Sequence, residues 1–319
     1  MTAPRLDLIT DVPGLRIGHA TSAGHGTGAT VLLCDALWPA AADVRGGGPG
    51  LREIEVMAPE NLVPGIHAIT LSGGSVFGLA AADGALVELA AAGIGLALGH
   101  GPPVPIVPGA VLFDLNGPGD KAWGTNPPYH ALGRAAARAA LDAPDGAPFA
   151  LGSVGAGTGA VAGAVKGGIG SASLALEAGL VVGALVAVNP AGAVATGGGG
   201  WGFDGDPFPP GGRLDRLGWM QPGTNTTLAV VACNARIDKA EAKRIAIMAQ
   251  DGLARAIRPV HTPFDSDVVF ALASGAIDLD PLCREGGATR PWWLARIGAA
   301  AADCLARAIV RGVAEAQTG

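Results

Sequence analysis

Charged and aromatic side chains are scarce in this chain of 319 residues. Only 15% of its residues are charged and 4% are aromatic, with a single tyrosine, whereas 49% are hydrophobic. Disordered chains show the opposite balance, so we expect a globular protein with a large core. The formal net charge of −6 argues against a nucleic-acid groove or a basic membrane-binding patch.

The chain also lacks long apolar runs and paired cysteines. The uncharged run Gly179–Val188 is about half as long as the ~20 residues of a membrane-spanning helix. The N-terminal residues include acidic residues and proline where a signal peptide has an apolar core, so we expect a cytoplasmic protein. No cysteine belongs to a CxxC pair or has a histidine at metal-ligand spacing, which predicts reduced thiols at Cys34, Cys233, Cys283 and Cys304.

Standard catalytic and binding motifs are missing as well. The chain has no GxxxxGK[ST] phosphate loop and no HExxH zinc motif. The segment Gly73–Phe77 departs from the nucleophile-elbow pattern, because Phe77 replaces the final glycine. We interpret it as a strand-to-helix turn with Ser75 as the N-cap. The alternative is that the backbone amides around Gly74 and Ser75 line a pocket.

Glycine and proline, in contrast, are abundant, at 52 and 24 residues, and they punctuate short apolar runs. Runs rich in β-branched residues or flanked by turn residues predict strands over Ala29–Cys34, His67–Leu71, Val181–Val188, Thr226–Cys233 and Val268–Ala273. Longer segments predict helices over Val76–Ala92, Ala131–Leu141, Lys239–Ile257 and Trp292–Ala314. This mixture predicts a layered α/β protein with both sheet faces covered.

Local patterns also locate one helix start and two loops. Asp238 is followed three residues later by Glu241, the capping-box arrangement, at the start of the third predicted helix. The glycine-rich segment Gly155–Gly170 and the long segment Thr196–Thr224 predict loops. The second loop is longer than compact domains usually tolerate without a function.

The segment Gly155–Ala160 fits the loose dinucleotide-binding pattern GxGxx(G/A), and Glu177 follows about 20 residues later. Further glycines after Ala160 would interrupt the helix that such a site requires. We therefore keep a Rossmann-like, NAD-binding oxidoreductase as an alternative function.

Two polar residues stand out against apolar surroundings. Lys166 is the one charged residue between Gly146 and Leu176, so it is either a surface lysine or a desolvated amine with a lowered pKa. Asn189 ends the predicted strand Val181–Val188 and precedes Pro190. It is either a turn residue or an amide donor to a developing oxyanion.

Hydroxyl and carboxyl groups precede the last two predicted strands. At Asn225–Thr226, the threonine either simply opens a strand or attacks the preceding carbonyl, which would leave a free α-amine able to act as its base. Asp265 and Asp267 flank a serine just before Val268. In an extended chain their side chains share one face, where they could balance a lysine, orient a hydroxyl or share a proton; the alternative is an exposed turn.

Taken in order, these segments resemble one family, the DmpA-type L-aminopeptidase/D-esterases and β-peptidyl aminopeptidases. The likeness is closer to the nylon-oligomer hydrolase branch, the 6-aminohexanoate-oligomer endohydrolases. The matching segments span nearly the whole chain and are Gly14–Thr21, Leu71–Leu79, Val165–Ser171, Val188–Pro190, Gly223–Thr227 and Asp265–Phe270.

The resemblance implies an αββα sandwich of the N-terminal-nucleophile type, formed by residues 1–319 as a single domain. It also implies self-cleavage into chains 1–225 and 226–319, between Asn225 and Thr226, with Thr226 as the nucleophile. Further residues match the family's lysine near the nucleophile, its oxyanion amide and its acidic pair; they are Lys166, Asn189, Asp265 and Asp267. The family's active-site tyrosine has one candidate here, Tyr129.

The implied activity is hydrolysis of small linear amides, such as nylon-type oligomers, short peptides or β-peptides, without a metal or organic cofactor. The implied assembly is a homotetramer, which also agrees with the low charged fraction, because oligomers bury apolar surface. A non-catalytic member of the family that stays uncleaved remains an alternative.

Overall fold

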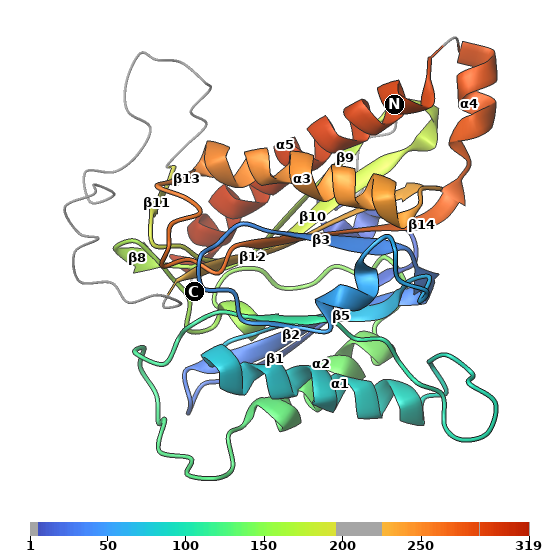
Figure 1. Ribbon diagram of the computed structural model, residues 1–319. Coiled ribbons are helices and arrows are strands. Elements are labelled where there is room, and N and C mark those ends of the chain that lie inside the picture. The colour runs from blue at the N-terminus through green and yellow to red at the C-terminus, as the bar shows by residue number, and fades with distance from the viewer. Residues whose placement is uncertain (1–5, 196–224, 287, 319) are drawn as a thin grey trace, which may run out of the picture.

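Two five-stranded sheets lie face to face between two layers of helices in the computed structural model, which describes residues 6–195, 225–286 and 288–318 (Figure 1). The first sheet has the order β1 (Leu15–Ser22), β2 (Thr27–Trp38), β5 (Ile66–Ser72), β6 (Gly109–Val111) and β4 (Leu51–Arg52). The second has the order β3 (Ala40–Val44), β14 (Val268–Ile277), β12 (Thr226–Ala235), β10 (Val181–Asn189) and β9 (Gly168–Ala175).

The helices cover the outer faces of the two sheets. Figure 1 shows α1 (Ala80–Ala91) and α2 (Tyr129–Asp142) on the first sheet, and α3 (Lys239–Ala256) and α5 (Arg290–Ala316) on the second. A shorter helix, α4 (Leu279–Gly286), lies between β14 and α5 in the chain. Two short antiparallel pairs complete the fold: the hairpin of β7 (Val161–Ala162) with β8 (Val165–Lys166), and β11 (Ala193–Val194) with β13 (Ile257–Arg258) from a distant part of the chain.

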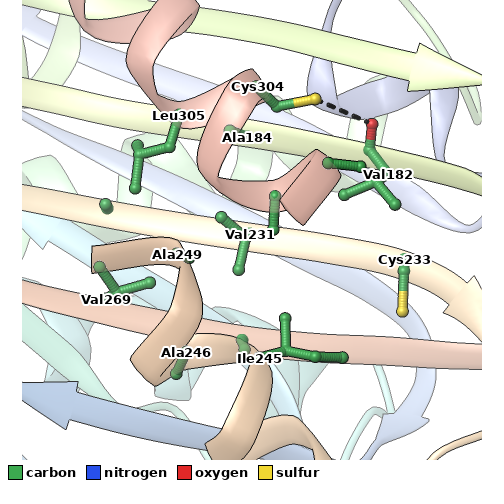
Figure 2. Packing of buried hydrophobic residues seen from close by; sticks show 14 of the residues in the cluster. Val182, Ala184, Val231, Cys233, Ile245, Ala246, Ala249, Val269, Cys304 and Leu305 are labelled. Carbon is green, nitrogen blue, oxygen red and sulfur yellow. Dashed lines mark hydrogen bonds between the residues drawn. The ribbon is translucent and has the colours of Figure 1, made fainter. Parts of the chain in front are cut away.

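Three apolar layers separate these four layers of structure. Because side chains alternate along a strand, even-numbered residues of β12 such as Leu228 and Val230 pack between the sheets. Odd-numbered ones such as Ala229 and Val231 pack under α3 and α5. Figure 2 shows this outer cluster, where Val231 lies among alanine and leucine side chains of both helices. A third cluster lies between the first sheet and α1 and α2.

Small residues let the helices approach the sheets closely. A Cβ atom at Gly170 of β9 would lie 1.9 Å from the carbonyl oxygen of Ala308 in α5. Any larger residue there would push α5 away from the sheet, so the abundance of glycine reflects packing as well as turns.

Most sequence-based expectations for the elements are confirmed. Each predicted strand and helix is present, and Asp238 and Glu241 form the expected reciprocal capping box at α3. The four cysteines are free thiols, and Cys34, Cys233 and Cys304 are buried. None of the helices in the described ranges combines the length and apolarity that a membrane crossing needs.

Three expectations need correction or lie outside the structure. Ser75 does not cap α1: it adopts φ +51° in the 3-10 helix Ser75–Leu79, and α1 begins only at Ala80. Gly155–Gly170 is not a continuous loop, because it contains a 3-10 turn at Gly155–Gly157, the β7–β8 hairpin and the start of β9. The predicted loop Thr196–Thr224 lies outside the described residues.

Candidate active site

Polar strand ends meet at one edge of the second sheet. Thr226 begins β12 and lies opposite Asn189, the last residue of β10. Strand β14 runs parallel to β12 with Leu228 opposite Val268, so the residues before Val268 reach the same edge. The sheet therefore assembles residues that are separated by up to about eighty positions in sequence.

Thr226 and Asn189 face the space between the two sheets. In β12, Leu228 and Val230 pack between the sheets, so alternation of side chains places Thr226 there too. In β10, Leu185 and Ala187 pack between the sheets, which places Asn189 on the same face. Thr227 faces the opposite side, toward the helices, in the row of Ala229. Both threonines are fully buried.

The Thr226 hydroxyl lies against the bond that joins Thr226 to Asn225. Its Oγ1 donates a hydrogen bond to the Asn225 carbonyl oxygen. The backbone N–H of Ser266 donates to the same oxygen, with an N···O distance of 3.0 Å. Two donors on one carbonyl oxygen polarise it, which favours attack at its carbon.

Asn189 links this edge to two neighbouring segments. Its Oδ1 accepts a hydrogen bond from the Val161 N–H at 2.8 Å, and its Nδ2 donates to the Phe113 carbonyl oxygen at 3.2 Å. These bonds orient the amide, and Nδ2 carries a second N–H. The side chain is thus placed opposite Thr226 with donor capacity.

Asp267 anchors the backbone next to Thr226. Its Oδ1 accepts the Thr227 N–H at 2.8 Å. Its Oδ2 accepts the His261 backbone N–H at 3.0 Å and faces the His261 ring nitrogen Nδ1 at 2.8 Å. Because a carboxylate can only accept, Nδ1 carries the proton. No sequence pattern pointed to His261, because it lies in a loop with five residues between it and Asp267.

Asp265 holds a second set of donors. Its Oδ1 accepts the Ala191 N–H at 3.0 Å, and its Oδ2 accepts the Thr262 N–H at 2.9 Å and the Thr262 hydroxyl at 2.5 Å. Burial, followed by the nearby charge of Asp267, raises the pKa of the Asp265 carboxyl. The exposed-turn alternative is therefore wrong for both carboxylates: each is buried and shapes the loop around Thr226.

Lys166 lies at the same end of the sheet. It belongs to the β7–β8 hairpin and comes two residues before Gly168, which lies opposite Val188 in β10. Its side chain is exposed in the described part of the chain. The Gln317 side chain, just after α5, donates to its carbonyl oxygen at 2.9 Å. The structure thus places Lys166 near the strand ends, and its chemical role stays a prediction.

Comparison with known proteins identifies the family. The family model of peptidase family S58 matches residues 7–319. An aminopeptidase of Mycobacterium tuberculosis, named as uncharacterized, is 43% identical over 98% of this chain and 95% of its own. A 6-aminohexanoate-oligomer endohydrolase of Kocuria sp. is 30% identical over 84% of this chain and 75% of its own. This chain belongs to peptidase family S58.

Solved structures agree with the assignment to S58. The β-aminopeptidase of a Burkholderia species is 25% identical and superposes with a TM-score of 0.69 over 98% of this chain and 87% of that one. The L-aminopeptidase D-Ala-esterase/amidase of Ochrobactrum anthropi, described as a variant of the Ntn-hydrolase fold, gives a TM-score of 0.70 at 20% identity, over 99% and 88% of the two chains. The αββα sandwich of the DmpA type is confirmed, and this S58 protein is a hydrolase of amide bonds.

The residues expected to bind substrate, Tyr129, Gly74 and Ser75, lie beside the first sheet in this S58 chain. Tyr129 is buried in the cluster between the first sheet and its helices, and burial raises the pKa of its phenol to about 12. A Cβ at Gly74 would lie 2.0 Å from the Tyr129 ring, and the Gly74 N–H donates to Asp114 at 2.8 Å. Ser75 follows at positive φ. Their role in binding stays a prediction.

The dinucleotide alternative is wrong for Gly155–Ala160. In this S58 chain the glycines form a 3-10 turn that leads into the short strand β7 instead of opening an α-helix. A pyrophosphate site of the Rossmann type needs a helix N-terminus at that point.

Proposed function

We propose that this S58 protein cleaves itself between Asn225 and Thr226 and then hydrolyses small linear amides, with Thr226 as the N-terminal nucleophile. One observation carries the proposal: the Thr226 hydroxyl lies against the Asn225 carbonyl, which Ser266 polarises from the other side. The proposal also agrees with the Ntn-hydrolase fold of its structural neighbours.

Self-cleavage is a shift of the Asn225 acyl group from the Thr226 nitrogen to the Thr226 hydroxyl oxygen, followed by hydrolysis of the ester. Thr226 Oγ1 attacks the Asn225 carbonyl carbon, and the Ser266 N–H stabilises the oxyanion. The bond from that carbon to the Thr226 nitrogen then breaks. The nitrogen leaves as an amine that has gained the hydroxyl proton, and an ester remains. Water hydrolyses the ester, which leaves a carboxylate on Asn225 and a free hydroxyl and α-amine on Thr226.

Turnover repeats the same chemistry on an external amide. The Thr226 α-amine, whose ordinary pKa is about 7.7–8, accepts the hydroxyl proton as Oγ1 attacks. The second N–H of Asn189 faces the oxyanion from the opposing strand. Lys166 supplies positive charge at the same edge, and Asp265 and Asp267 hold the loop and the Thr227 backbone in position. No step requires a metal or an organic cofactor.

The family relatives support two substrate classes. One relative is named an aminopeptidase and another a 6-aminohexanoate-oligomer endohydrolase. Short peptides, β-peptides and aminohexanoate oligomers are all small linear amides that Thr226 could attack.

Variants of the two adjacent threonines test the proposal. Thr226→Ala should abolish both self-cleavage and amide hydrolysis, and Thr226→Ser should keep part of both because a hydroxyl remains. Thr227→Val is the matched control, since the Thr227 hydroxyl faces the helices and is buried without a hydrogen-bond partner. Cleavage by Thr226→Ala, measured by intact mass, would contradict the assignment. A folded wild-type chain that stays whole and inactive would be the non-catalytic member of the family.

A further inference from the structure

Asn225 is paired like a strand residue with the segment Phe264–Ser266. Its backbone N–H donates to the Phe264 carbonyl oxygen at 3.3 Å, and its carbonyl oxygen accepts the Ser266 N–H at 3.0 Å. This is a parallel β-bridge with Asp265 as the opposing residue. The two bonds contact the nitrogen and the carbonyl on either side of one α-carbon, so together they recognise an α-amino acid unit.

Self-cleavage and turnover pass through the same kind of intermediate, given the function proposed above. When Thr226 Oγ1 attacks Asn225, the product is an ester between the threonine hydroxyl and an α-aminoacyl group. An acyl-enzyme formed from an external α-aminoacyl amide is the same chemical species, with another side chain. The groups that hold the Asn225 backbone in the first reaction are therefore available to the acyl group in the second.

The Phe264–Ser266 segment is held by bonds that do not involve Asn225. The Asp265 carboxylate is fixed by Ala191 and Thr262, and the Asp265 carbonyl oxygen accepts the Gly48 N–H at 2.9 Å. The Ser266 hydroxyl donates to the Gly48 carbonyl oxygen. These anchors remain when the Asn225–Thr226 bond is cut, so the segment stays preorganised.

We infer that Phe264–Ser266 is the acyl-recognition edge of the enzyme and that it selects acyl groups with an N–H on the α-carbon. The Phe264 carbonyl oxygen accepts that N–H, and the Ser266 N–H binds the carbonyl oxygen as it becomes an oxyanion. The α-nitrogen can be free or acylated, because in Asn225 itself it belongs to a peptide bond. A 6-aminohexanoyl group carries its nitrogen four carbons beyond the α-carbon and leaves the Phe264 oxygen without that donor.

Four p-nitroanilides with the same six-carbon acyl chain separate these features. L-Norleucine p-nitroanilide has a free α-amine and N-acetyl-L-norleucine p-nitroanilide an acylated one. 6-Aminohexanoyl p-nitroanilide is an isomer of the norleucine compound with the amine at the far end, and hexanoyl p-nitroanilide has none. The kcat/KM of self-cleaved wild-type protein is measured for each and divided by the rate of hydroxide-catalysed hydrolysis, which corrects for intrinsic reactivity.

The inference predicts that both α-nitrogen compounds exceed the other two by about tenfold or more, the effect of one hydrogen bond made in the transition state. The hexanoyl and 6-aminohexanoyl compounds should lie within about threefold of each other, since the edge provides no separate recognition of the distal amine. If the corrected kcat/KM of the N-acetyl compound falls to that of the hexanoyl compound, the enzyme recognises the positive charge of a free α-amine instead of an α-N–H, and the inference is wrong. The inference is also wrong if the corrected kcat/KM of the 6-aminohexanoyl compound equals or exceeds that of the two α-nitrogen compounds.

Self-cleavage separates failure of this inference from failure of the proposed function. A chain that cuts itself at Thr226 but hydrolyses none of the four anilides overturns the shared recognition edge and leaves the self-cleavage step intact. A chain that does not cut itself and hydrolyses none of them contradicts both.

Discussion

Thr226 and Thr227 are neighbours in sequence, but their hydroxyls face opposite sides of the second sheet. The Thr226 hydroxyl faces the space between the sheets and contacts the Asn225 carbonyl. The Thr227 hydroxyl faces the helices. The two residues are linked through the backbone. Asp267 accepts a hydrogen bond from the Thr227 N–H, and this bond fixes the direction in which Thr226 enters the strand. One carboxylate therefore positions the backbone at Thr226, the proposed nucleophile, through the Thr227 N–H.

His261 is the residue through which this arrangement can be perturbed most selectively. It adopts φ +54°, an uncommon conformation for a side chain of its size, and holds Asp267 by two N–H groups. We expect His261→Ala to slow self-cleavage about tenfold, because the carboxylate loses the ring donor and can turn away from Thr227. His261→Asn should recover most of the rate, since its amide can donate from nearly the same place.

The measurement is the rate at which freshly refolded chain is converted into fragments, together with the free energy of unfolding. A purely structural role would lower stability in both variants and leave the rates of the folded proteins equal. Equal cleavage rates for His261→Ala and wild type would show that Asp267 needs no help from the ring.

At the scale of elements, charged contacts between helices add a pH-dependent contribution to stability. Glu88 of α1 accepts hydrogen bonds from Arg138 and Arg134 of α2, at 2.8 and 2.5 Å. The arginine hydrogen bonds lower the pKa of Glu88 below its ordinary value of 4.5. Because the folded chain binds this proton less tightly than the unfolded chain, the contribution is complete above the ordinary pKa and is lost as the pH falls through the lowered one.

Glu88→Gln should therefore lower Tm at pH 7 by a few degrees or less, since both arginines are largely exposed and exposed ion pairs contribute little. The difference between variant and wild type should shrink as the pH falls below about 4.5. Thermal unfolding of both proteins from pH 3 to 7 tests this. A difference that grows on acidification would have the wrong sign.

The sequence predicted the types of these elements better than their limits. Strands such as Val181–Val188 carry continuous β-branched or apolar residues, which periodicity detects. Strand β9, Gly168–Ala175, was hidden because its glycines and serines resemble a loop; those glycines are needed for the approach of α5. The extra 3-10 turn before α1 was hidden because Ser75 takes a left-handed conformation that no local pattern requires.

In the candidate site, too, the sequence predicted some residues and missed others. Thr226, Asn189, Asp265 and Asp267 stood next to predicted strands, so sheet pairing could bring them to one edge. His261, Thr262 and the Ser266 amide contribute through loop geometry and backbone atoms, which side-chain patterns do not encode. Tyr129 had no strand or partner to place it, and the structure finds it in a different layer.

At the scale of the whole molecule, the proposed cut would pass through the middle of the second sheet. Strand β12 would begin the small chain but lie between β10 of the large chain and β14 of the small one. The large chain would supply the whole first sheet and part of the second, and the small chain β12, β14, α3 and α5, so separating them would expose much of the core. We expect the two chains to elute together under native conditions and to separate only in denaturant.

We also propose that the protein is a homotetramer. The chain has 15% charged residues, and large apolar side chains such as Leu62, Leu98 and Phe77 are exposed. Closed symmetric assembly buries such surface. Light scattering on dilute protein should give about four protomer masses. A mass of one protomer, with activity unchanged by further dilution, would contradict the tetramer.

The intact mass of freshly purified wild-type protein shows directly whether the chain cuts itself before Thr226. Self-cleavage should give two species of about 22 and 9 kDa, from the average residue mass of the 31.3 kDa chain. N-terminal sequencing of the smaller one should read Thr-Thr-Leu-Ala. A single species of 31.3 kDa that hydrolyses amides at full rate would show that Thr226 never becomes an N-terminus and would contradict the mechanism.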